Sequence, residues 1–138
     1  MAKIKSENPY TVVPGEIHFA DDEIVINADR QAETIVMENK GDRPVQIGSH
    51  FHLYEVNPAM AFYDKDGNLD EERLIVWGKR FDIPSGTAIR FEPNEKKQVN
   101  IIPTAGSREV YGLDNLVDGP LGNGPKTPYT KAKGLKNL

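Results

Sequence analysis

The chain has 138 residues, which suits one domain with a hydrophobic core and leaves little room for two. Cysteine is absent, which excludes disulfides, thiolate metal sites and a cysteine nucleophile, so unaided metal or acid–base chemistry would depend on three histidines and on carboxylates. Seventeen basic and 21 acidic residues give a net charge of −4, and every acid precedes residue 119, a balance that argues against a nucleic-acid-binding body.

The N-terminal residues 1–12 include lysines but no apolar run after them, so no signal peptide is expected. The longest apolar runs, 59–62 and 74–77, are far too short to cross a bilayer. Together with the absence of cysteine, these features predict a cytoplasmic protein that contacts neither membranes nor nucleic acids.

Short apolar segments lie between glycines and prolines, and within them apolar residues recur mostly at every second position. In the segment 87–92, for example, Ile89 and Phe91 would share one face of a strand, as expected where one side of a sheet meets a core. Such a chain is predicted to be all-β. The expected strands are 15–19, 23–26, 34–38, 45–47, 50–56, 80–83, 87–92 and 98–102.

Two short helices are expected to interrupt this pattern. Asn57 is a good N-cap residue and Pro58 suits the first helical position, which predicts a helical turn over 57–62. The segment 70–77 has acids in its first turn and ends before Gly78, so it also reads as a helix. Beyond residue 119, Gly, Pro, Thr and Lys dominate, and we predict no regular structure there: the four lysines suit a solvated tail or an arm that docks on an acidic surface.

The histidines supply the most prominent candidate site. On a strand, His50 and His52 would share a face and could bind one metal ion, with Glu55 as a third ligand, an arrangement similar to half of a cupin metal motif. However, Ile89 stands where the second cupin motif needs a histidine, and Glu55 would lie on the opposite strand face. Two ligands do not hold a catalytic metal, so structural hydrogen bonds at a sheet or subunit surface are favoured. Ser49 should also point away from His50, which argues against a serine–base pair.

A calcium loop is a second candidate, over residues 64–75. The opening acids and amide suit it, but Leu69 stands where the sharp turn needs glycine and Ile75 where a bidentate glutamate is needed, so residues 64–68 read as an exposed turn. The chain also lacks phosphate-binding loops, dinucleotide fingerprints and nucleophile elbows. Residue chemistry alone therefore predicts a non-catalytic domain.

Several contiguous runs resemble the urease beta subunit family. The longest is NKGDRPVQIGSHFH at 39–52, continued by EVN at 55–57. The others are VPGE at 13–16, GKRFDIPSGT at 78–87, RFEP at 90–93 and YG at 111–112, in the family's order from about residue 13 to residue 113.

The resemblance implies a bent-ribbon (β-clip) or jelly-roll-like small barrel with one or two short helices. It implies a beta-type domain at 13–119, an N-terminal arm at 1–12 and a lysine-rich C-terminal tail at 120–138. Segment 58–77 is expected to be an insertion that, like the arm and tail, varies surface and assembly contacts.

The same resemblance implies a subunit without catalytic, cofactor-binding or metal-ligating residues of its own. Its partners would be urease alpha and gamma chains, in a particle of three heterotrimers. The alpha chain would hold two nickel ions bridged by a carbamylated lysine and would hydrolyse urea to ammonia and carbamate.

Other functions stay open at this point. The alternative is a stand-alone cupin-like metal enzyme that uses His50 and His52, and a third possibility is a solitary binding module. Within the urease hypothesis, the two histidines could help deliver nickel with accessory proteins during maturation, or they could lie at a subunit interface.

Overall fold

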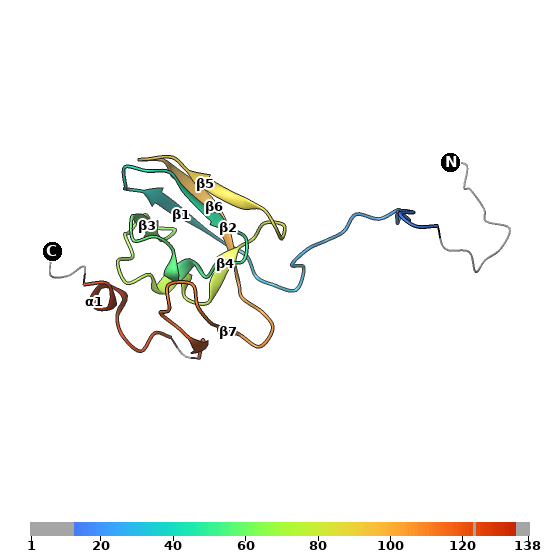
Figure 1. Ribbon diagram of the computed structural model, residues 1–138. Coiled ribbons are helices and arrows are strands. Elements are labelled where there is room, and N and C mark those ends of the chain that lie inside the picture. The colour runs from blue at the N-terminus through green and yellow to red at the C-terminus, as the bar shows by residue number, and fades with distance from the viewer. Residues whose placement is uncertain (1–12, 123, 135–138) are drawn as a thin grey trace.

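The structure is a computed structural model that describes residues 13–122 and 124–134 (Figure 1). Its main element is a four-stranded antiparallel sheet in the order β3-β1-β6-β4, and two two-stranded sheets, β2-β5 and β7-β8, accompany it. The strands are β1 (Glu33–Asn39), β2 (Val45–Gly48), β3 (Met60–Tyr63), β4 (Lys79–Phe81), β5 (Ala88–Phe91), β6 (Lys96–Pro103), β7 (Glu109–Val110) and β8 (Gly119–Pro120). Two 3₁₀ turns, η1 (Leu53–Glu55) and η2 (Leu74–Val76), and one short helix, α1 (Tyr129–Ala132), complete the elements of the described residues.

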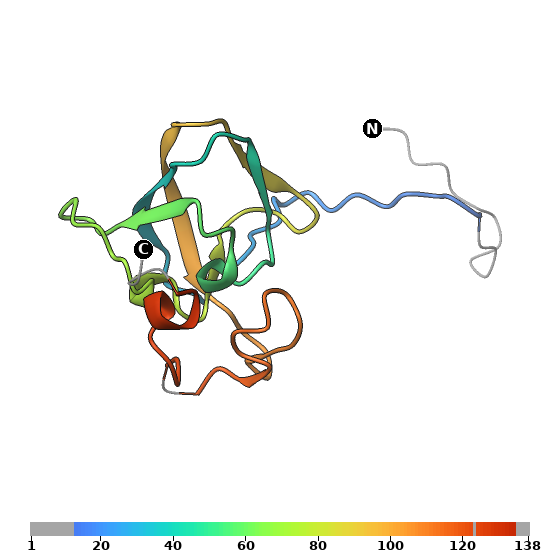
Figure 2. The same cartoon turned by 60° about the vertical axis from the view of Figure 1, so that its left-hand side comes forward.

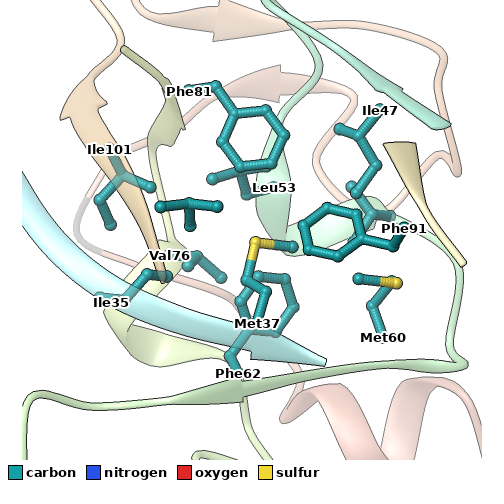
Figure 3. Packing of buried hydrophobic residues seen from close by; sticks show 12 residues of the cluster. Ile35, Met37, Ile47, Leu53, Met60, Phe62, Val76, Phe81, Phe91 and Ile101 are labelled. Atoms are coloured by element: carbon teal, nitrogen blue, oxygen red, sulfur yellow. The ribbon is translucent and has the colours of Figure 1, made fainter. Parts of the chain in front are cut away.

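The hydrophobic core lies between the four-stranded sheet and the β2-β5 pair. β1 contributes Ile35 and Met37 from alternate positions, and β6 contributes Val99 and Ile101 in the same way. Side chains from both sheets and from the turns meet in the centre (Figure 3). The buried cluster consists of Ile35, Met37, Ile47, Leu53, Val56, Met60, Phe62, Val76, Phe81, Phe91, Val99 and Ile101. The predicted all-β class is confirmed, because period-two burial is what a sheet with one buried face requires.

Several predicted elements are wrong. Segments 15–19 and 23–26 form no strands: they are extended and exposed. The expected strand at 50–56 is a turn followed by η1, since four consecutive residues from Leu53 to Val56 are buried and no alternation remains. The helix expected over 57–62 is a turn at Asn57 that leads into β3.

The helix expected over 70–77 is also wrong. Asp70 does cap a backbone N–H, but the N–H belongs to Ile75, and Arg73 has φ 58°, a left-handed conformation that interrupts an α-helix. Only the 3₁₀ turn η2 follows it.

Regular structure also continues past residue 119, where none was expected. β8 pairs with β7, and α1 packs on the body through the buried residues Tyr129 and Thr130. Residues 1–12 and 135–138, which contain the predicted arm and the end of the predicted tail, lie outside the described residues.

Candidate functional site

His52 lies inside the molecule at the start of η1. It is 2% exposed, and its Nε2 accepts a hydrogen bond from the backbone N–H of Gly78 at 2.8 Å. Because Nε2 acts as an acceptor, we assign the ring hydrogen to Nδ1, which donates to Glu55 Oε2 at 2.9 Å. The other carboxylate oxygen of Glu55 accepts from the backbone N–H of Leu116 at 3.0 Å. This polar chain therefore joins three segments that are far apart in the sequence.

Aromatic rings enclose that polar chain. The Tyr54 ring lies 4.7 Å from Trp77 and 5.4 Å from Tyr129, in edge-to-face contacts, and the His52 ring stacks 5.9 Å from Tyr54. Burial raises the pKa of Tyr54 to about 12, and the negative charge of Glu72 adds to the shift. The His52–Glu55 pair is thus shielded from solvent on its aromatic side.

His50, in contrast, is exposed. Its Nδ1 lies 2.8 Å from the hydroxyl oxygen of buried Ser49, so the prediction that these neighbours point apart is wrong, because residues 49 and 50 lie in a turn and not in a strand. Partial burial and the nearby guanidinium groups of Arg80 and Arg30 lower the pKa of His50 below its ordinary value of 6.5. In the described part of the chain, no carboxylate hydrogen-bonds to this imidazole to orient it as a catalytic base would be oriented.

The two histidines do not form one site. His50 faces solvent and His52 lies in the core, and Glu55 contacts His52 instead of pointing away from it as the strand geometry predicted. Both ring nitrogens of His52 are engaged by protein groups. Within residues 13–122 and 124–134, no group of three or more His, Cys, Asp or Glu side chains could hold a metal ion. These residues therefore do not fit a metal centre.

Arg73 is a buried group that the sequence analysis missed. Its guanidinium donates four hydrogen bonds of 2.7–3.1 Å to backbone carbonyls, and its charge lies over two aromatic rings, 4.2 Å from Tyr129 and 4.9 Å from Phe62. The acceptors are the carbonyl oxygens of Tyr54, Val56, Asn57 and Met60. Burial lowers the pKa of Arg73 to about 10, so the group keeps its charge at neutral pH. The one sequence feature that could have indicated this buried role is the position of the arginine directly before the apolar run 74–77.

A cavity of about 350 Å³ opens beside Arg73. It is lined by apolar groups such as Met60 and Leu69, by the carboxylates of Asp70 and Glu71, and by Tyr129. Thr130 also lines the cavity, and its hydroxyl donates a hydrogen bond to the Glu72 carboxylate.

The described residues thus define a small all-β protein whose buried polar groups hold its own loops together. No helix among them is long and apolar enough to cross a membrane. The family model described as "Urease beta subunit" matches residues 14–120.

Curated relatives agree with that match. The urease subunit beta of Ureaplasma parvum serovar 3 is 59% identical over 114 residues, which cover 83% of this chain and 92% of the relative. Those of Geobacillus kaustophilus and Clostridium perfringens are each 46% identical, and the matches cover 82% and 80% of this chain and 95% and 99% of the relatives. The chain belongs to the urease beta subunit family. It is therefore a component of a multi-subunit urease, a hydrolase, and nothing in these comparisons supports the cupin alternative.

Proposed function

We propose that the chain is a non-catalytic urease subunit that holds the catalytic chain in its working geometry. The urease would hydrolyse urea to ammonia and carbamate with two nickel ions held in the partner alpha chain. The observation that carries this proposal is the use of the polar groups: both nitrogens of His52 and both carboxylate oxygens of Glu55 bind protein atoms, so they are committed to the chain's own loops.

The partners in this proposal are alpha and gamma chains, in a particle of three heterotrimers located in the cytoplasm. Residues 13–119 form the family domain, while the arm 1–12 and the lysines of the segment 120–138 contact partner surfaces. The family match over 14–120 supports these bounds, and the exposed side chains of Lys126 and Lys131 suit an acidic surface.

His50 and His52 take different roles in the proposal. His52 positions the loop around η1, whereas His50 contacts a partner chain, because its imidazole is exposed and lies beside Arg80 and Arg30. A second candidate role for His50 is nickel delivery with urease accessory proteins. One observation favours it: the hydrogen bond of the imidazole within the described residues involves Nδ1 and not Nε2. The neighbouring arginines repel a divalent cation, so we favour the interface role.

Co-expression tests the proposal directly. The tagged chain should copurify with alpha and gamma chains in a nickel-containing particle that hydrolyses urea, and the chain alone should bind no stoichiometric nickel. Failure to copurify would contradict the subunit role. For His50, nickel loading of the particle is compared between the unsubstituted chain and H50N: unchanged loading excludes delivery, while a slower rate in an intact particle supports it.

A further inference from the structure

Residues 13–26 leave the body as an extended segment, which we call the apolar strap (Figures 1 and 2). The strap is anchored where it ends, at Asn27. The side-chain amide of Asn27 donates to Asp82 Oδ1 at 2.8 Å, and the side-chain Oδ1 of Asn27 accepts from Arg80 at 3.1 Å. Before Asn27 the chain runs away from both sheets. The end of the strap at Asn27 is therefore fixed, and the rest of the strap can contact another surface.

The strap exposes large apolar side chains along most of its length. Ile17 is 71% exposed, Phe19 83% and Ile24 90%. Scattered exposed apolar residues are ordinary, but a contiguous series on one segment marks an interaction site. Val13, Val25 and Ile26 extend the series.

The backbone of the strap also makes little contact with the rest of the described residues. Its hydrogen bond within the described residues is a turn from Glu16 N–H to the Val13 carbonyl, and residues 17–26 make none to other described backbone groups. Yet the sequence predicts strands at 15–19 and 23–26. Ile17 and Phe19 would share one strand face, and Ile24 and Ile26 would share another. Strand-forming residues that have no strand partner among the described residues of their own chain point to a partner in another chain.

The charge of the strap indicates which chain that is. Residues 13–26 contain the acids Glu16, Asp21, Asp22 and Glu23 and no lysine or arginine. Pairing with the strap of a second copy would bring like charges opposite one another, which destabilises a sheet. A different chain with an apolar strand edge bordered by basic side chains is complementary.

We propose that the strap adds to the sheet edge of a partner chain in the urease complex, as two short strands at 16–20 and 23–26 separated by the bend at 21–22. This inference rests on the proposed function, since it needs the assembled particle. Backbone hydrogen bonds would supply attachment, and the apolar side chains would fix the register.

Residue-resolved hydrogen exchange on the isolated chain and on the assembled particle tests the inference. In an added edge strand, only alternate amides face the neighbour, so in the particle every second amide within 16–20 and 23–26 should be protected. All of them should exchange fast in the isolated chain. An assembled particle in which the strap exchanges as fast as in the free chain overturns the inference and leaves the proposed function standing. Failure to assemble overturns both, and the same protection in a self-associated isolated chain overturns the choice of partner.

A pair of variants tests the anchoring side chains. The double variant I17S/F19S should weaken capture of the partner chains by about 10- to 100-fold, as expected for losing two buried apolar groups. The control L113S removes an apolar side chain that is 50% exposed on the body and should leave capture unchanged. Equal effects of the two variants would contradict a specific role for the strap. Because Ile17 and Phe19 are exposed, near-ultraviolet circular dichroism of the body should not change.

Discussion

His52 stabilises the folded chain, a role that its place in a histidine-containing motif does not reveal. H52A would leave the Glu55 carboxylate and the Gly78 N–H buried without that partner. We expect it to lower the free energy of unfolding by about 3 kcal/mol, in the range measured when one partner of a buried polar pair is removed. Guanidinium denaturation measures the change. The matched variant H50A removes an exposed ring and should change stability by less than about 0.5 kcal/mol; similar losses for both variants would refute the assignment.

The pKa of His50 gives a second test at this scale. Partial burial, Arg80 and Arg30 all lower the pKa of its imidazole below 6.5. Its folded-state pKa is therefore below its unfolded-state pKa, so the group contributes stability above about pH 6.5 that is lost as the pH falls through the folded value. An NMR titration should show a midpoint below 6.5, and R30Q should move it upward. A midpoint above 6.5 would contradict this arrangement.

Arg73 explains how η2 is tied to the loop around η1. R73K keeps a positive charge but cannot present the planar fork that serves four carbonyls, so some acceptors would be left buried without a donor. We expect a loss of about 2 kcal/mol or more in the free energy of unfolding. R43K, at a side chain 90% exposed, is the control and should be neutral. A neutral R73K would mean that the carbonyls find other donors.

At the scale of elements, Tyr129 attaches helix α1 to the body. Its ring lies under the Arg73 guanidinium, and its hydroxyl is buried with no hydrogen-bond partner among the described residues. Y129F should therefore be neutral or more stable by up to about 1 kcal/mol, whereas Y129A should lose about 3–5 kcal/mol because it removes the buried ring. Thermal unfolding of both variants measures the difference. A clear loss in Y129F would indicate a partner for the hydroxyl.

The strands of the core and the exposed turn at 64–68 were predictable from sequence, whereas the turns η1 and η2 were not. β1, β5 and β6 show the burial alternation from which they were predicted, since Ile35, Met37, Val99 and Ile101 contact one core. The predicted helix at 70–77 failed because Arg73 turns inward to bind distant carbonyls, which local propensity cannot register. The predicted strands at 15–19 and 23–26 show no partner strand within the described residues of this chain.

The candidate site was likewise predictable from sequence only in part. The sequence singled out His50 and His52 and indicated that they do not form a catalytic metal site. It could not predict that one ring lies inside and the other outside, because that depends on a turn at 49–51 instead of a strand. Nor could it pair Glu55 with Leu116, which is 61 residues away.

At the scale of the whole molecule, the described residues form a β body, a C-terminal helix packed on it and an exposed strap. The buried polar groups of His52 and Glu55 in the body hydrogen-bond to other groups of the same chain. The strap, the largest exposed apolar segment of the described residues, projects away from the core (Figure 2). This division suits a subunit that is stable by itself and adds surface for assembly. It supports our proposal, which assigns the chemistry of the urease to another chain.

The most direct test of that assignment is a measurement of nickel content and ammonia release from urea, made on the isolated chain and on the particle assembled with alpha and gamma chains. We predict that the isolated chain has neither stoichiometric nickel nor activity and that the particle has both. One nickel ion per isolated chain, or ammonia released by that chain alone, would contradict the account.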